Sequence, residues 1–290
     1  MSAAQATVRT ATVGTIAFLN CHPIRWGLAR QPPAFRLVSG SPGYLASELL
    51  AGRLDVSPVS LLDYLEYADA LALLPGPAIG SDGPVLSCVL ASRVPLAKLD
   101  GQPVRLTAAS RTTVLLARIY LEDVLGVRPR FVTAVPAQTG PDPIEPNPIE
   151  PNPAEPDPVA FVEIGDEALR LSTAPPPGWT VHDLGTLWRS WTGLPMVFAV
   201  WAARKDFAAG HPAALRSVQD SLTCALIDAL DQLSAVAADA VPLSGGLSER
   251  VLLSYFRTLD YSFGERQQAG LRAFAALAAI RIPILAGVIP

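Results

Sequence analysis

The sequence predicts an α/β fold arranged as two lobes, and three observations lead to this prediction. The chain has 290 residues, which suits two lobes of roughly 100–200 residues each better than one small domain. Half of the residues are hydrophobic and only 17% are charged, so the chain can fill a sizeable core. Short apolar runs alternate with longer helical patterns at the start of the chain, which is typical of strand–helix–strand units around a largely parallel sheet.

The strands and helices of the first half are predicted from apolar runs and from the residues that begin or end them. An apolar run at 12–19 predicts a buried strand, and Pro23 then stands where the first turn of a helix tolerates proline. Ser41 precedes the next helical pattern, and Gly52 is placed to end it. Strands are predicted at 12–19, 35–38, 55–59, 85–92 and 103–107, and helices at 23–29, 44–51, 61–67 and 114–125.

The second half contains further strands and then only helices. Strands are predicted at 131–135, 159–164, 180–184 and 196–202, and helices at 213–237, 248–258 and 265–279. Between the first two of these strands, residues 141–158 repeat Pro-Asp/Asn-Pro-Ile/Ala-Glu. Prolines remove backbone donors and fix φ, so this segment is expected to be an extended or disordered surface loop. It is either a silent repeat expansion or a ligand for a proline-binding module.

Net charge and hydropathy limit the kinds of molecule that the protein is expected to bind. The formal net charge of -4 argues against binding nucleic acid, which requires a surplus of Lys and Arg. A small ligand is the better expectation. The most apolar stretch, 271–289, is interrupted by Arg272 and Arg281, and residues 1–10 lack the pattern of a secretory signal. We therefore expect a cytoplasmic protein with no membrane partner, and its oligomeric state is left open.

Cofactor and metal motifs are missing from the sequence. Cys21, Cys88 and Cys224 are far apart and form no C-x-x-C pair, so we expect buried free thiols rather than a disulfide or a zinc site. Neither the glycine-rich nucleotide motifs nor H-E-x-x-H nor G-x-S-x-G occurs. No nucleotide cofactor and no catalytic metal are therefore expected. The three histidines are isolated, and His22 is the one that lies beside a strand end, where ligands of α/β sheets bind.

Polar residues follow the predicted strands at their carboxyl ends. They are Asn20, Ser39, Ser41, Ser60, Ser87 and the run Ser110, Arg111, Thr112 and Thr113. Such groups supply directed hydrogen bonds, and backbone N–H groups at a helix start add the positive end of a dipole. Together they predict a cleft that binds a carboxylate. Any single one of them could instead serve only as a helix cap.

Five short blocks occur in a fixed order along the chain. They are GTIAFLNCHP at 14–23, GRLDVSPVS at 52–60, IGSDGPVLS at 79–87, IGDEAL at 164–169 and WTGLP at 191–195. These blocks resemble those of the chorismate dehydratase family of the futalosine pathway of menaquinone biosynthesis, and the resemblance covers residues 13–204. Leu86 stands where that family is expected to have a basic residue, and the 141–158 repeat is foreign to the family pattern.

The resemblance implies a fold of the periplasmic-binding-protein type II, with two lobes joined by two crossing strands. Residues 1–94 and 195–290 would form one lobe and residues 95–194 the other, including the proline-rich loop. It implies a carbon–oxygen lyase, without a cofactor, that converts chorismate to 3-[(1-carboxyvinyl)oxy]benzoate and water. The alternatives are a solute-binding protein of the same fold, a sensor lobe, and the sister enzyme that makes the dihydroxynaphthoate.

The resemblance and the strand-end pattern together give a set of expected site residues. Asn20 and Ser87 are the expected catalytic residues. The expected substrate-binding residues are Ser41, Ser60, Ser110, Arg111, Thr112, Thr113, Gly165 and Asp166. No carboxylate or imidazole in the matched blocks is flanked by an evident partner that would tune its pKa. The sequence therefore favours a substrate carboxylate as the base.

Overall fold

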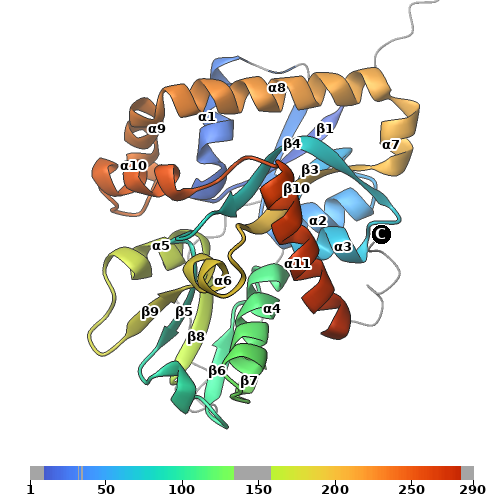
Figure 1. Ribbon diagram of the computed structural model, residues 1–290. Helices are drawn as coiled ribbons and strands as arrows, with labels where there is room; N and C mark the ends of the chain where they lie inside the picture. Colours follow the sequence, from blue (N-terminus) through green and yellow to red (C-terminus); the bar gives the residue numbers. More distant parts are fainter. Residues whose placement is uncertain (1–9, 32, 34, 134–157, 282–290) are drawn as a thin grey trace, which may run out of the picture.

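Two five-stranded sheets, one above the other in Figure 1, each form the centre of a lobe. The computed structural model describes residues 10–31, 33, 35–133 and 158–281. Helices flank both sheets, so the prediction of a two-lobed α/β fold is confirmed. Within the described ranges, no helix is both long and apolar enough to cross a membrane.

The first lobe combines the start of the chain with its end. Its sheet has the order β2-β1-β3-β10-β4, with β1 parallel to β2 and β3 and with β10 antiparallel to β3 and β4. The strands are β1 (Thr12–Ile16), β2 (Arg36–Gly40), β3 (Val56–Ser60), β4 (Leu71–Ser81) and β10 (Met196–Arg204). The helices are η1 (Leu19–Cys21), α1 (His22–Arg30), α2 (Pro42–Leu50), α3 (Leu61–Glu66), α7 (Lys205–Gly210), α8 (Pro212–Asp231), α9 (Leu233–Ala240), η4 (Val241–Leu243), α10 (Glu249–Thr258) and α11 (Glu265–Arg281).

The second lobe is formed by the middle of the chain. Its sheet has the order β7-β6-β8-β5-β9, with β6 parallel to β7 and β8 and with β5 antiparallel to β8 and β9. The strands are β5 (Cys88–Ser92), β6 (Pro103–Leu106), β7 (Arg130–Thr133), β8 (Ala160–Ile164) and β9 (Thr180–Asp183). The helices are η2 (Leu96–Lys98), α4 (Arg111–Ile119), η3 (Tyr120–Val124), α5 (Gly165–Thr173) and α6 (Leu184–Thr192).

The chain passes between the sheets twice, from β4 to β5 and from α6 to β10. Since β5 pairs with β8 and β9, the first passage lies before Cys88 rather than at the expected boundary of residue 94. The passage itself is held by Asp183, whose carboxylate accepts hydrogen bonds from the backbone N–H groups of Val85 at 3.0 Å and Leu86 at 2.6 Å.

The strand register brings three strand ends to one edge of the first sheet. Val13 of β1 lies beside Val56 of β3, and Ile16 lies beside Gly40 of β2. Because the three strands are parallel, the segments that follow them leave the sheet at the same edge. The polar residues predicted at these ends therefore lie along a common rim, and the segments after β1 and β3 bond from this rim to α5 and α4 of the second lobe.

Strand β4 was missed by the sequence analysis. Its segment contains Pro75 and Pro77 on either side of Gly76, which indicates a break in a strand. In the structure β4 is the last strand of the order, and its pairing with β10 skips residues 74–77. Proline is tolerated at such an edge bulge because its missing N–H is not needed by a neighbouring strand.

Other boundaries differ in smaller ways. The strand predicted at 85–92 begins only at Cys88, because Leu86 adopts a left-handed conformation with φ 61° that ends any regular strand. The single helix predicted at 213–237 is two helices, α8 and α9. The prediction of three buried thiols is wrong for Cys224, which is exposed, whereas Cys21 and Cys88 are buried. Residues 141–157 of the repeat lie outside the described residues.

Candidate active site at the junction of the lobes

The two lobes touch where the strand ends of the first sheet meet the first turns of α4 and α5. The backbone N–H of Leu19 donates to Asp166 Oδ1 of α5 at 3.0 Å. The backbone N–H of Leu62 at the start of α3 donates to Thr112 Oγ1 of α4 at 2.9 Å. The helix starts thus lie across from the rim formed by the strand ends, where their N–H groups favour an anion.

Asn20 lies in η1, directly after the loop that leaves β1. Its backbone carbonyl accepts a hydrogen bond from Tyr261 Oη at 2.7 Å. Its side-chain Oδ1 is buried and has no hydrogen-bond partner among the described residues. A buried polar atom without a partner costs about 1–3 kcal/mol, so it is a natural place for a ligand to supply one.

Ser87 ends the passage between β4 and β5. Its side chain is 2% exposed, and its Oγ accepts a hydrogen bond from Tyr255 Oη of α10 at 2.9 Å. Its backbone carbonyl accepts from the N–H of Gly165 at 2.8 Å. Ser87 is therefore fixed from both lobes, by α10 of the first and by the start of α5 of the second.

Gly165 and Asp166 form the first turn of α5. Gly165 has φ +69°, and a Cβ atom there would lie 3.3 Å from the ring of Phe18, so the position requires glycine. Burial raises the pKa of Asp166, while the N–H of Leu19 and the guanidinium groups of Arg170 and Arg25 oppose this shift. Asp166 is thus a carboxyl group at the junction that keeps its proton to a higher pH than a solvated one does.

Three of the predicted serines cap helices. Ser41 Oγ accepts from the N–H of Tyr44 at 3.3 Å at the start of α2. Ser60 Oγ caps α3 and donates to Asp63 Oδ2 at 2.7 Å. Ser110 Oγ caps α4 and donates to the hydroxyl of Thr113 at 3.0 Å. Ser41 and Ser60 thus fix helix starts at the rim, and Ser110 fixes the start of α4 across from it. None of the three side chains makes a hydrogen bond between the lobes in these contacts.

Arg111, Thr112 and Thr113 differ in how they use their polar groups. Arg111 is half exposed and pairs across the junction with Asp63 at 2.8 Å and with Glu66. Thr112 is buried against α3, as described above, and Thr113 Oγ1 lies 3.6 Å from the sulfur of Cys88. In this arrangement the charge of Arg111 is neutralised by α3.

Several groups near the junction were not found from the sequence. Burial raises the pKa of Glu163 at the end of β8, and a charged residue inside an apolar strand was a signal for it. Arg25 of α1 donates to the backbone carbonyls of Ile16 and of Phe18, the latter at 2.9 Å. Arg25 thereby holds the loop before Asn20, and a lone cation in the helical run after Pro23 was its only signal.

His22 turns away from α5. Its Nε2 lies 3.1 Å from Asp239 of α9, and its ring stacks on Phe256 of α10. Burial and the charge of Arg25 lower the pKa of His22, and Asp239 opposes them only in part. His22 is therefore a neutral packed residue of the first lobe. In the described ranges, no group of three His, Cys, Asp or Glu side chains is arranged to hold a metal ion.

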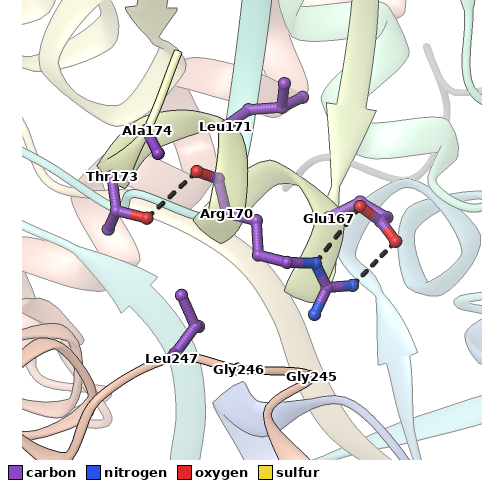
Figure 2. A pocket seen from close by; sticks show the side chains of 8 residues that line it. All are labelled: Glu167, Arg170, Leu171, Thr173, Ala174, Gly245, Gly246 and Leu247. Carbon is purple, nitrogen blue, oxygen red and sulfur yellow. Dashed lines mark hydrogen bonds and ion pairs between the residues drawn. The ribbon is translucent and has the colours of Figure 1, made fainter. Parts of the chain in front are cut away.

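A surface pocket of about 300 Å³ adjoins the junction and is lined by α5 and the loop at 245–247 (Figure 2). In Figure 2 the Arg170 side chain extends to the carboxylate of Glu167, with which it pairs at 2.7 Å. Arg170 also donates to the carbonyl of Ser244 at 2.8 Å, which ties the second lobe to the first. None of the predicted site residues lines this pocket.

Comparisons with known proteins agree with the sequence resemblance. A family model described as menaquinone biosynthesis matches residues 11–280. A Thermus thermophilus protein named chorismate dehydratase is 31% identical over 272 residues, which cover 92% of this chain and 95% of that protein.

Solved structures with the same fold are more distant in sequence. A protein from Archaeoglobus fulgidus is 15% identical and has a TM-score of 0.69, with 94% of this chain and 97% of that chain covered. The alkanesulfonate-binding protein SsuA from Xanthomonas axonopodis pv. citri is 14% identical with a TM-score of 0.63, covering 97% and 94%. A Candida albicans protein described as having the generic periplasmic binding protein fold is 10% identical with a TM-score of 0.60, covering 96% and 93%. The predicted fold type is confirmed.

Proposed function

Because the chain belongs to the menaquinone biosynthesis family, we propose that it is a chorismate dehydratase, a hydro-lyase that converts chorismate to 3-[(1-carboxyvinyl)oxy]benzoate and water. The observation that carries this proposal is the 31% sequence identity to a protein named chorismate dehydratase, over 95% of that protein's length. A cytoplasmic location and a small anionic substrate as the main partner are parts of the same proposal.

The substrate is proposed to bind at the junction of the lobes. Asn20 Oδ1 has no hydrogen-bond partner among the residues that the structure describes, and the first turns of α4 and α5 offer backbone N–H groups to a carboxylate. Asp166 and Thr112 are among the residues that join the lobes beside this site, so the substrate is proposed to enter when the lobes separate. Closure then removes water and strengthens each polar contact.

The reaction removes the proton at ring C3 and the hydroxyl at C4. Conjugation through the ring alkene to the C1 carboxylate makes the C3 proton acidic, and donors that hold this carboxylate stabilise the charge that spreads onto it. The electron pair left at C3 forms the new ring double bond as the C4 hydroxyl departs. Asn20 and Ser87 are proposed to orient the ring and to hydrogen-bond the departing hydroxyl, which leaves as water with the proton that the base took from C3.

The enolpyruvyl carboxylate of the substrate is proposed as the base. Folded toward C3, it reaches the proton within the same molecule, and proximity supplies much of the rate. Among the side chains, Asp166 is the rival base, because it lies at the junction and its pKa is raised by burial. Its Oδ1 already accepts the N–H of Leu19, which favours a binding role for it instead.

The proposed activity is tested by incubating purified protein with chorismate. We expect loss of chorismate and appearance of an aromatic product lighter by one water, followed by ultraviolet absorbance and by mass. The rival is a solute-binding protein of the same fold. Tight binding of an amino acid, sugar or sulfonate together with no turnover of chorismate would support that rival and refute the dehydratase.

The identity of the base is tested with a chorismate analogue whose side-chain carboxylate is a neutral amide. It should bind competitively with chorismate and react very slowly. Asp166→Asn should keep most of the turnover, since an amide oxygen still accepts the N–H of Leu19. Normal reaction of the analogue, or loss of turnover in Asp166→Asn with binding intact, would assign the proton transfer to the protein.

A further inference from the structure

We propose that Tyr255 is a positioning residue that fixes the orientation of the Ser87 hydroxyl, an inference that rests on the proposed function. Tyr255 lies in α10, within the first lobe, and its side chain is 1% exposed. Its Oη donates to Ser87 Oγ at 2.9 Å, although the two residues are 168 positions apart in the sequence. Nothing in the sequence pattern of the last three helices marks this residue as part of the site.

Tyr255 remains a hydrogen-bond donor under all ordinary conditions. Burial raises the pKa of its phenol well above the usual range, and the nearby acidic groups Asp166, Cys88 and Cys21 act in the same direction. Only its contact with Ser87 opposes the shift. The phenol therefore keeps its proton and directs it at the serine oxygen.

The bonding capacity of Ser87 then determines where its own proton points. A serine hydroxyl has one proton and two lone pairs, and Tyr255 occupies one lone pair. The protein acceptor for the Ser87 proton is the carbonyl of Val85, which is distant at 3.4 Å and already accepts the Ser87 backbone N–H at 2.7 Å. A contact of that length is weak, so a substrate oxygen can replace it.

The backbone of Ser87 does not depend on Tyr255. It is held by its own N–H to Val85 and by the N–H of Gly165. Removal of the phenol hydroxyl therefore leaves Ser87 in place but lets its side chain rotate. Such a change acts on the reacting complex more than on substrate binding, and it lowers kcat rather than raising KM.

A double-mutant cycle with chorismate as substrate tests this inference. Tyr255→Phe should lower kcat roughly tenfold, the cost of one poorly placed hydrogen bond, with KM changed less than about twofold. In the Ser87→Ala background the same substitution should change kcat by less than about twofold, because the hydroxyl it orients is gone. Tyr67→Phe, which removes an exposed phenol hydroxyl, is the control and should leave kcat unchanged.

The outcomes separate this inference from the proposed function. A wild-type protein that does not consume chorismate refutes both. If the wild type consumes chorismate, the positioning role alone is refuted by either of two results. In one, Tyr255→Phe leaves kcat unchanged; in the other, it lowers kcat by the same factor in the Ser87 enzyme and in the Ser87→Ala enzyme. If Tyr255→Phe does not fold, 3-fluorotyrosine at position 255 keeps the ring and strengthens the donor. It should alter kcat in the Ser87 enzyme and leave the Ser87→Ala enzyme unchanged, and equal changes in both would overturn the inference.

Discussion

Asn20 and Ser87 are each held on one side by a tyrosine hydroxyl and have unused bonding capacity on the other. Tyr261 donates to the carbonyl of Asn20, and Tyr255 donates to the hydroxyl of Ser87. Burial raises the pKa of Tyr261 well above its usual range, so it too stays protonated. The Asn20 backbone and the Ser87 hydroxyl are thereby held in place and lose little further freedom when a substrate binds, which is the property that an active site requires.

Truncation of either residue should reduce activity without unfolding the protein. A hydrogen bond to a charged ligand contributes about 1.5–3 kcal/mol, so Asn20→Ala and Ser87→Ala should lower kcat/KM by about tenfold or more. Ser217→Ala on the exposed face of α8 is the matched control, and its kinetics should stay at the wild-type level. Wild-type kinetics in both site variants would remove these residues from the site.

The raised pKa of Asp166 predicts a specific dependence of stability on pH. An acid whose pKa is higher in the folded state holds its proton more tightly there, so its contribution to stability is present at low pH and is lost as pH rises through that pKa. The window begins near the ordinary aspartate value of 3.8 and extends upward. Asp166→Asn removes this loss and still accepts the N–H of Leu19.

The measurement is the difference in the free energy of unfolding between Asp166→Asn and wild type at several pH values. The contributions of the other titrating groups are the same in both proteins and cancel in this difference. The remaining pH dependence is therefore that of Asp166. The difference should move in favour of the variant as pH rises above about 4. A difference that is flat, or that moves in favour of wild type, would contradict the burial of this carboxylate.

Some of the residues proposed for the site lie in short local blocks of the sequence, and the others follow predicted strands. Asn20, Ser87 and Asp166 belong to such blocks and were named from them. Tyr255 and Arg25 were not, because their roles come from packing between segments distant in sequence or from backbone carbonyls that no pattern reveals. The sequence gives no direct signal for a donor that reaches its partner across the core.

At the level of elements, the clearest strand signal in the sequence is a long apolar run. β10 lies inside the first sheet, is nearly wholly buried and reads as a continuous hydrophobic segment, whereas the buried strands β1 and β3 also contain small polar residues, and β3 contains a proline. β4 could not be predicted in this way because Pro75 and Pro77 interrupt its apolar run. The structure accommodates them because β4 lies at the edge of the sheet. The outer edge of β4 is covered by the backbone of Asp260 and Tyr261, which bond to Gly80 and Ala78.

Helix α11 packs so closely on the second passage between the lobes that one position requires glycine. A Cβ atom at Gly270 would lie 2.0 Å from the backbone carbonyl oxygen of Pro195. Gly270→Ala should therefore destabilise the protein by about 1–3 kcal/mol, as overpacking does. Gly43→Ala in helix α2, where a Cβ meets nothing within 4 Å, should be neutral or stabilising by up to about 1 kcal/mol.

Urea unfolding of the two glycine variants checks this prediction. Equal stability of both variants would show that α11 is not seated against Pro195 as described. Loss of stability in Gly43→Ala would instead point to an error in the start of α2.

At the level of the whole molecule, several polar contacts join the lobes. They include the hydrogen bonds of Asp166 and Thr112, the ion pairs of Arg111, and the contact of Arg170 with the carbonyl of Ser244. Polar contacts of this kind exchange readily with water, so they suit an interface that opens and closes. The sequence predicted two lobes, but it could not predict how they are held together.

Arg170 gives a test of closure outside the proposed site. Arg170→Ala removes the contact between α5 and Ser244, so the average radius of gyration of the protein without substrate should rise. KM should increase by up to about fivefold, since a partly exposed contact contributes up to about 1 kcal/mol. Arg53→Ala breaks a pair with Glu48 inside the first lobe and is the matched control. Identical scattering and kinetics in both variants would show that Arg170 does not bias closure.

The most direct test of the account is the rate of chorismate consumption by the wild-type protein and by Ser87→Ala, measured side by side with the product identified by mass. The account predicts that the wild type forms an aromatic product lighter by one water. It predicts that Ser87→Ala, with the same melting temperature to within a few degrees, is slower by about tenfold or more. No turnover by the wild type, or equal turnover by the two proteins, would contradict a dehydratase site at the junction of the lobes.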